Sequence, residues 1–325
     1  LLVLCGVIFF ILEPIGFNLE QRLSTTIFAA IVMGTLMFWR FRLAIALVGI
    51  SLLLFTGVLP LQGALTYMNL DVIIFLVSMM IIIEELEHVG FFRYIGLTLV
   101  KKVNYNPTKL MVLFMGLSAF TAAFIDEVTS ILIISAMILR VCSAMKISPV
   151  PYIIAAVMAT NIGSAMTVMG NPVGILVALR AGLTFEEYVR WSTPIAMTAL
   201  AAIIPICLLY FRKALRNSAM NLTINTTEIE QNRIIDPTKF KVIFTIFLTT
   251  VILIALHHRI ELILEMEKNT MLVSAPLLGA GLILLMERGR ARDIVENGVD
   301  WWTLLFFMFL FAMAGTLEHT GVTMK

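Results

Sequence analysis

The sequence has few charged residues and few of the side chains that catalytic and metal sites use. Asp, Glu, Lys and Arg make up 14% of the 325 residues, against about 25% in a typical soluble domain. The three cysteines, Cys5, Cys142 and Cys207, are scattered through apolar segments, which indicates packing residues and not disulfides. The four histidines have no ligand-like spacing. A soluble domain, a disulfide framework and a metal centre are therefore excluded as primary interpretations.

Several enzyme motifs are also missing. The chain has no HExxH zinc-protease motif, no Gly-x-Ser-x-Gly nucleophile motif and no Walker motif. We therefore expect that the chain is not an enzyme, that it does not itself hydrolyse ATP, and that it needs no cofactor beyond a coupling ion. We expect no nucleic-acid partner.

What the sequence has instead is apolar runs of membrane-spanning length. Hydrophobic residues make up 60% of the chain, and the mean hydropathy is +0.99. A helix needs about 20 apolar residues to cross about 30 Å of hydrocarbon. The runs predict spans over residues 1–16, 25–39, 42–60, 71–86, 192–213, 239–257, 269–286 and 301–317. The chain therefore reads as an all-α, multi-pass integral membrane protein of the cell membrane.

The segment from 107 to 183 differs from these runs. Polar and glycine-rich breaks interrupt its apolar blocks, which predicts a re-entrant hairpin over 107–146 and a broken, unwound transmembrane helix over 149–183. The preceding residues 91–102 combine aromatic and basic side chains, as a helix lying along the membrane surface does. Residues 217–238 have the composition of a flexible polar linker.

The distribution of basic residues predicts the orientation. If 107–146 enters and leaves on one side, the loops on that side carry 17 of the 23 Lys and Arg residues. The other side carries Arg22, Arg180, Arg190, Arg259 and Lys268. Because basic loops stay in the cytoplasm, the side with the larger number, including the linker, is predicted to be cytoplasmic.

An internal repeat accompanies this pattern. Residues 74–90 align with 305–321, and Leu-Glu-His-x-Gly occurs in both. By the charge distribution the two copies cross in opposite directions, which is the inverted-repeat architecture of many secondary transporters. The predicted parts are an N-terminal span at 1–24, a first repeat at 25–216, a cytoplasmic linker at 217–238 and an incomplete second repeat at 239–325. The hairpin of the second repeat would follow Lys325.

Two stretches place polar residues at membrane depth, where a carboxylate costs roughly 2.5–3.5 kcal/mol on insertion scales. They are 118–130 at the hairpin tip and 160–174 in the broken helix. Unwound carbonyls, amides and hydroxyls suit a bare cation such as Na⁺, and the helix N-termini after residues 127 and 172 suit an anion. The candidate substrate- and ion-binding residues are Asp126, Glu127, Thr129, Ser130, Asn161, Gly163, Ser164, Thr167, Gly170 and Asn171. The expected Na⁺ ligands are Asp126, Thr129, Asn161 and Asn171.

Structural alternatives stay open for these residues. Asp126 or Glu127 could cap the returning helix, and Asn171-Pro172 could be an ordinary interhelical turn. Glu84 and Glu85, near the cytoplasmic end of their span, could carry protons or pair with Arg93. Asp71 and Asp300 begin spans and are expected to be helix caps.

At these residues the sequence resembles the ion transporter superfamily. The likeness is to its arsenite-permease and pink-eyed-dilution (P protein) branch, related to NhaD-type sodium/proton antiporters and to dicarboxylate and citrate permeases. It is carried by Ile125-Asp126-x-Val128-Thr129, by Ala159-Thr160-Asn161-Ile162-Gly163 and by Gly170-x-Pro172, and it covers nearly all of 40–325.

The resemblance implies a scaffold and a mobile transport part that shifts like an elevator, with a homodimer formed through the scaffold helices. The transport part would hold the hairpin and the broken helix. Motif positions that the resemblance marks as substrate- or ion-site residues are Asp126, Thr129, Asn161, Gly163 and Gly170.

Two positions depart from the family pattern. The hairpin of the family commonly reads Asp-Asn-Val-Thr, and here Glu127 replaces the Asn. The unwound loop commonly reads Gly-Asp-Pro, and here Asn171 replaces the Asp. Because the number of carboxylates is unchanged, we hypothesise that Glu127 compensates for the missing Asp.

These features favour a secondary active transporter of a small inorganic or carboxylate anion, coupled to Na⁺ or H⁺. A Na⁺/H⁺ antiporter is an alternative, because the same loops would serve it. A passive anion channel is a second alternative, and saturation or coupling to a gradient would exclude it.

Overall fold

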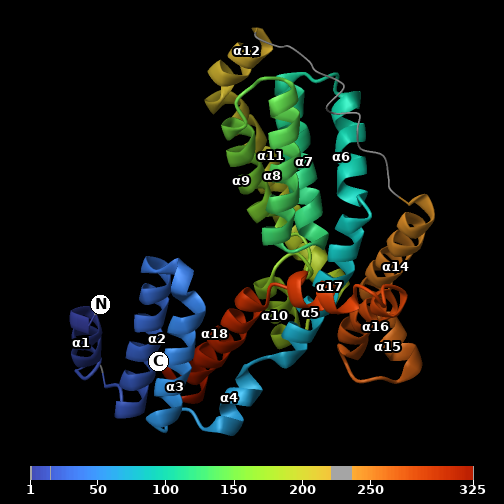
Figure 1. The fold of residues 1–325 in the computed structure, drawn as a ribbon. Coiled ribbons are helices and arrows are strands. Elements are labelled where there is room, and N and C mark those ends of the chain that lie inside the picture. The colour runs from blue at the N-terminus through green and yellow to red at the C-terminus, as the bar shows by residue number, and fades with distance from the viewer. Residues whose placement is uncertain (1, 15, 221–235, 325) are drawn as a thin grey trace. The chain divides into compact units, whose positions relative to one another are not determined.

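The computed structural model describes residues 2–14, 16–220 and 236–324, and within them it contains helices and no strand (Figure 1). Contacts divide the chain into two compact units. One comprises Leu1–Ile74 and Asp300–Lys325, and the other comprises Phe75–Val299. Five described helices are long and apolar enough to cross a bilayer, or up to seven if each of two bent pairs is one span. The predicted all-α membrane architecture is confirmed.

The first unit is a group of helices around α18. Its elements are α1 (Leu2–Ile11), α2 (Leu19–Met37), η1 (Trp39–Phe41), α3 (Arg42–Phe55), α4 (Leu61–Tyr67), the start of α5 (Leu70–His88), α18 (Trp301–His319) and η2 (Val322–Met324). The chain bends by 120° between α2 and Trp39–Phe55, so the two segments do not form one straight helix. The predicted span 42–60 ends early, because Gly57 adopts a left-handed φ of 71°.

Polar contacts hold both ends of α18 in this unit. Arg42 donates to the Thr303 hydroxyl at 2.7 Å, and Gln21 donates to the Thr320 carbonyl at 3.0 Å. Asp300 caps α18 by accepting from the Thr303 amide at 3.1 Å, as predicted. Between these ends, Ile31, Leu53 and Met313 belong to one buried apolar cluster.

The second unit contains the hairpin and the broken helix. Its elements are the rest of α5, α6 (Phe91–Lys102), α7 (Pro107–Phe124), α8 (Glu127–Ala144), α9 (Val150–Ser164), α10 (Pro172–Ala181), α11 (Phe185–Tyr210), α12 (Arg212–Met220), α14 (Pro237–Ala255), α15 (His257–Leu264), α16 (Thr270–Met286) and α17 (Ala291–Asn297). α7, α8, α9 and α11 form a bundle, with α6 and α12 packed on it (Figure 1).

Helix boundaries follow the sequence closely in this unit. α6 covers the residues predicted for a surface helix, and the hairpin and broken helix lie within 107–146 and 149–183. The half-helices begin at Glu127 and Pro172, one residue earlier than predicted, because Asp126 and Asn171 are the N-caps. Helices extend into both ends of the predicted linker 217–238, and its residues 221–235 lie outside the described part of the chain.

Candidate functional site

The hairpin tip is a short break between two antiparallel helices. α7 ends at Phe124, Ile125 is extended, and Asp126 begins α8. One oxygen of Asp126 accepts from the amides of Val128 and Thr129 at 3.0 Å each, so the capping role is real. The side chain is 9% exposed, and its second oxygen has no partner in the described part of the chain. The cap therefore uses only half of this carboxylate.

The broken helix packs its backbone directly against the hairpin. A Cβ on Gly163 would overlap the backbone of Ala119 on α7. A Cβ on Gly170 would overlap the carbonyl oxygens of Ser164 and Ala122. Both predicted glycines thus permit close backbone approach, which no other residue allows at these places.

Hydroxyl groups fasten the two segments together. Ser118 and Thr160, both buried, share a hydrogen bond of 2.9 Å between α7 and α9. Thr167, in the unwound segment, donates to the Ala123 carbonyl of α7. The hairpin tip and the unwound segment therefore form one structural element.

Two donors from α11 complete the unwound segment. Ser192 donates to the Ala165 carbonyl, and Thr193 donates to the Met166 carbonyl at 2.7 Å. These groups satisfy carbonyls that the break in the helix leaves without amide partners. Neither residue was predicted as part of the site, although the Ser-Thr-Pro run at 192–194 places polar side chains in an otherwise apolar helix.

Ser164 joins the two positions that depart from the family pattern. Its hydroxyl donates to a Glu127 carboxylate oxygen at 3.2 Å. The Asn171 amide nitrogen donates to the Ser164 carbonyl at 2.9 Å and lies 3.4 Å from the same hydroxyl. Asn171 also caps α10 by accepting from the Gly174 amide at 2.7 Å. Glu127, the first residue of α8, and Asn171, the N-cap of α10, are thus linked through Ser164.

Other predicted residues are placed less centrally. Ser130 is fully buried, and its hydroxyl has no partner within the residues described. Thr129 is half-buried, and its backbone amide donates to the Asp126 carboxylate. Asn161 is exposed, and its side-chain amide donates to the Val157 carbonyl of its own helix at 3.0 Å. Its side chain therefore does not join the network around Ser164, although its backbone carbonyl lies 3.1 Å from the Ser164 hydroxyl and accepts from it. The expected Na⁺ ligand set therefore stays a prediction.

The charge environment of the tip is unusual for one buried and one half-buried carboxylate, Asp126 and Glu127. No lysine or arginine forms an ion pair with Asp126 or Glu127 in the ranges that the structure describes. Their partners are amides and a hydroxyl. Over the same residues there is no group of three His, Cys, Asp or Glu side chains that could hold a metal ion. The tip therefore offers oxygen atoms and net negative charge, which suit a small hard cation or a proton.

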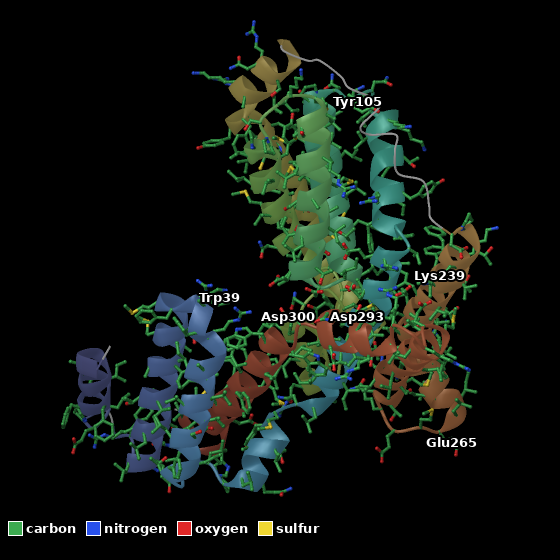
Figure 2. All side chains as sticks on the ribbon, viewed as in Figure 1. Trp39, Tyr105, Lys239, Glu265, Asp293 and Asp300 are labelled. Carbon is green, nitrogen blue, oxygen red and sulfur yellow. The ribbon has the colours of Figure 1, made fainter. Side chains whose placement is uncertain are left out.

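Glu85 has the opposite environment in the same unit. Its fully buried side chain pairs with Lys239 at 2.9 Å and with Arg290 at 3.3 Å, and Lys239 also pairs with Glu287 at 2.9 Å (Lys239 is labelled in Figure 2). Lys239 lies on α14, and Arg290 lies directly before α17. Two acids and two bases balance in this network, which favours a structural role for Glu85.

Comparison with known proteins places these features in a family. The sequence profile described as citrate transporter matches residues 27–324. An uncharacterized transporter of Mycobacterium tuberculosis is 34% identical over 78% of the chain and 56% of its own length. A 46 kDa membrane protein of Mycobacterium leprae is 30% identical over 79% of the chain and 58% of its own length. The chain thus spans less than two thirds of these relatives.

More distant relatives agree with the resemblance seen in the sequence. A putative arsB transporter of Dictyostelium discoideum is 24% identical over 55% of the chain and 32% of its own length. The P protein of Mus musculus is 26% identical over 53% of the chain and 22% of its own length. The predicted relation to the arsenite-permease and P protein branch is confirmed.

Proposed function

Because the chain belongs to the citrate transporter family, we propose that the protein is a secondary active transporter that couples a small carboxylate or inorganic anion to Na⁺ or H⁺. The observation that carries this proposal is the pair of carboxylates at the hairpin tip, Asp126 and Glu127, which have no cationic partner in the described residues. A transported cation or proton supplies the missing positive charge.

The anion is assigned to the half-helix N-termini. α8 begins at Glu127 and α10 begins at Pro172, and each has a partial positive charge at its first turn. In α8 the Asp126 carboxylate already occupies the amides of Val128 and Thr129, so the amide of Glu127 is the one left in that turn. Pro172 removes one amide from the first turn of α10, while the Asn171 side chain occupies the amide of Gly174. A cation bound between the termini and the carboxylates would strengthen the attraction for the anion, which gives coupling a direct electrostatic origin.

Uptake into proteoliposomes tests this function. The complete natural protein would be reconstituted, and internal pH, internal Na⁺ and internal anion would be read with citrate, arsenite or no anion supplied. We expect saturable cation movement only when an anion is present. Proton movement driven by a Na⁺ gradient without any anion would instead establish a Na⁺/H⁺ antiporter. Non-saturating anion flux that ignores both gradients would establish a channel.

We further propose that Glu127 stands in for an acidic residue at position 171. Support comes from Ser164, which contacts both side chains, so a carboxylate at either position reaches the same hydroxyl. The test compares Glu127→Asn, Asn171→Asp and the double variant carrying both changes. The double variant should transport at least about tenfold faster than Glu127→Asn, since it restores the charge. If it is no faster than the slower single variant, the two positions are not interchangeable.

The inverted repeat is proposed on the order and length of the helices. α4 and α17 each have 7 residues, and each precedes a 19-residue helix, α5 or α18. The bounds of α5 and α18 coincide with the alignment of 74–90 on 305–321. We also propose a homodimer and cytoplasmic basic loops, on the family resemblance and on the distribution of Lys and Arg respectively.

A further inference from the structure

Helix α15 turns its ionisable side chains inward and its apolar side chains outward. Leu262, Ile263 and Leu264 are strongly exposed, whereas His257 and Glu261 are 1% and 3% exposed. Residues four apart in a helix lie on the same face, so the two buried side chains are neighbours. α15 packs with α14 and α16, which lie beside it in Figure 1. The outward face suits lipid, and the inward face holds a buried imidazole and a buried carboxylate.

The hydrogen bond of His257 fixes which ring nitrogen carries the hydrogen. Nδ1 lies 2.8 Å from the Ile254 carbonyl oxygen. A carbonyl oxygen can only accept, so Nδ1 is the donor, and in the neutral ring Nε2 then has a bare lone pair. Nε2 is buried and has no hydrogen-bond partner among the described residues. His257 therefore presents a basic nitrogen to the interior of the protein.

Glu261 is held in a comparable way by one of its two oxygens. Oε1 accepts from the Met271 amide at 2.9 Å and so caps α16, whose N-cap residue Asn269 makes no side-chain cap bond. Oε2 of Glu261 and Oδ1 of Asn269 are buried, and neither has a partner in the part of the chain that the structure describes. We call His257, Glu261 and Asn269 the α15 corner. Its unpaired atoms are all acceptors, so what the corner needs is a donor.

The elements around the α15 corner add no buried ionisable group within the residues described. α14 beyond Lys241 and α16 have no ionisable side chain. The ionisable groups on the rest of α15, on the turn to α16 and on the start of α11 are exposed or half-buried, and they are His258, Arg259, Glu265, Glu267, Lys268, Glu186, Glu187 and Arg190. Arg259 pairs with Glu186 at 3.1 Å, and Lys268 donates to the Gly182 carbonyl (Glu265 is labelled in Figure 2). These charges lie at the surface and are screened by solvent.

We infer that His257 and Glu261 form a proton-binding site that is separate from the carboxylates of the hairpin tip. A proton from water forms a bond to the lone pair of Nε2, and the imidazolium then donates toward Oε2 of Glu261, directly or through one water. The proton is assigned to the ring because an imidazole ordinarily binds a proton more tightly than a carboxylate does. The carboxylate stays ionised and neutralises the imidazolium, so the net charge of the two groups changes from negative to zero. A transition-metal ion is not assigned here, because it needs three or four strong ligands.

The test is nitrogen NMR of the complete natural protein with isotope-labelled histidine, recorded over a range of pH. Wild type is compared with His257→Gln, which assigns the ring by the loss of its signals, and with Glu261→Gln, which keeps an oxygen for the Met271 amide. The matched control is His258→Gln, since His258 is the adjacent, half-buried histidine of the same helix. Thermal unfolding at each pH checks that the variants are folded. Glu261→Gln retains the ring and tests the site without His257→Gln, because a neutral ring with its hydrogen on Nδ1 has a distinct nitrogen signal.

We expect His257 in alkaline wild type to carry hydrogen on Nδ1 and none on Nε2, and to gain the second proton between about pH 8 and pH 5. Glu261→Gln should lower the ratio of protonated to neutral ring at a fixed pH at least about tenfold, since a nearby opposite charge favours the charged form by about one to three pH units. His258→Gln should change this ratio less than about twofold.

Three results would overturn the inference. They are a hydrogen on Nε2 of His257 at alkaline pH, a ring that stays neutral at every pH at which the protein is folded, and an unchanged ratio in Glu261→Gln. Titration with Zn²⁺ alone checks the remaining alternative. Binding of one Zn²⁺ per chain that His257→Gln abolishes would assign the α15 corner to a metal ion instead of a proton.

Discussion

Glu85 and Asp126 are both buried carboxylates in the unit Phe75–Val299, yet their surroundings differ. Glu85 has two protein cations within 3.3 Å, and a second acid balances the charge of the network. Asp126 accepts two backbone amides on one oxygen and has no partner on the other in the described residues. A carboxylate that the protein's own cations neutralise contributes to the stability of the fold. A buried carboxylate without such a partner is neutralised when a cation or a proton binds.

The difference extends to the helices that carry the two groups. Glu85 lies within α5, where its ion pairs reach α14 and the residue before α17. Asp126 lies at a break where hydroxyls and close backbone contacts replace ion pairs. Substitutions at these two places should therefore separate stability from transport.

The largest effect is expected for Asp126→Asn. Loss of a unit charge about 4 Å from a cation removes about 4 kcal/mol at an effective dielectric of 20, which lowers cation affinity roughly 10³-fold. Stability should change by only a few tenths of a kcal/mol, because Asn caps a helix about as well as Asp. Proteoliposome uptake and thermal unfolding measure the two quantities. Normal transport by this variant, or a loss of transport that unfolding explains, would contradict the expectation that the Asp126 charge acts in transport and not in stability.

Glu85→Gln should show the reverse pattern. It leaves Lys239 and Arg290 without their buried partner, and we expect a loss of about 2–3 kcal/mol, reduced from the full buried-pair value because both cations are partly exposed. Thermal unfolding in detergent measures the loss. Glu287→Gln is the matched control, because it removes one half-buried partner of Lys239 and should cost less. Transport per folded molecule should remain, and its disappearance in Glu85→Gln would make Glu85 part of the transport site.

Gly163→Ala tests the close contact between the broken helix and the hairpin. The added methyl would overlap the Ala119 backbone, and such overpacking costs about 1–3 kcal/mol. The control is Gly116→Ala on α7, where a Cβ meets nothing within 4 Å and helix propensity favours alanine. Unfolding and uptake of both variants are compared. Equal behaviour of the two would show that the backbones are not in contact.

The smallest effect is expected for Thr193→Val. It removes the donor to the Met166 carbonyl of the unwound segment and should cost about 1 kcal/mol, with a fall in uptake. Thr198→Val is the control on the same helix, since Thr198 donates to the Pro194 carbonyl of its own helix. Uptake that falls to the same extent in both variants would remove the assigned role of Thr193.

Much of the fold could be predicted from local sequence. The breaks at Asp126 and Asn171 follow from the cost of polar groups in an apolar span, and the surface helix 91–102 follows from its aromatic and basic composition. The half-helices begin one residue earlier than predicted, at Glu127 and Pro172, because Asp126 and Asn171 are the N-caps. Local patterns are sufficient for these features because the interactions are within one or two turns.

The contacts between distant segments could not be predicted in this way. Glu85 was considered a partner of Arg93, yet it pairs with Lys239 and Arg290, which are more than 150 residues away. Asn161 was expected in the site by motif position, yet its side chain bonds its own helix. Ser192 and Thr193 were missed because a donor to an unwound carbonyl has no local signal of its partner. These contacts depend on which helices pack against one another, and a local sequence pattern does not show that.

Equilibrium cation binding to the complete natural protein and to its Asp126→Asn variant tests most directly whether Asp126 binds the coupling ion. Bound Na⁺ and bound or released protons are both measured, with and without citrate. We expect wild type to take up a cation, Na⁺ or H⁺, that Asp126→Asn does not take up. Equal uptake of both cations by the two proteins would show that the carboxylate at the hairpin tip is not the coupling site.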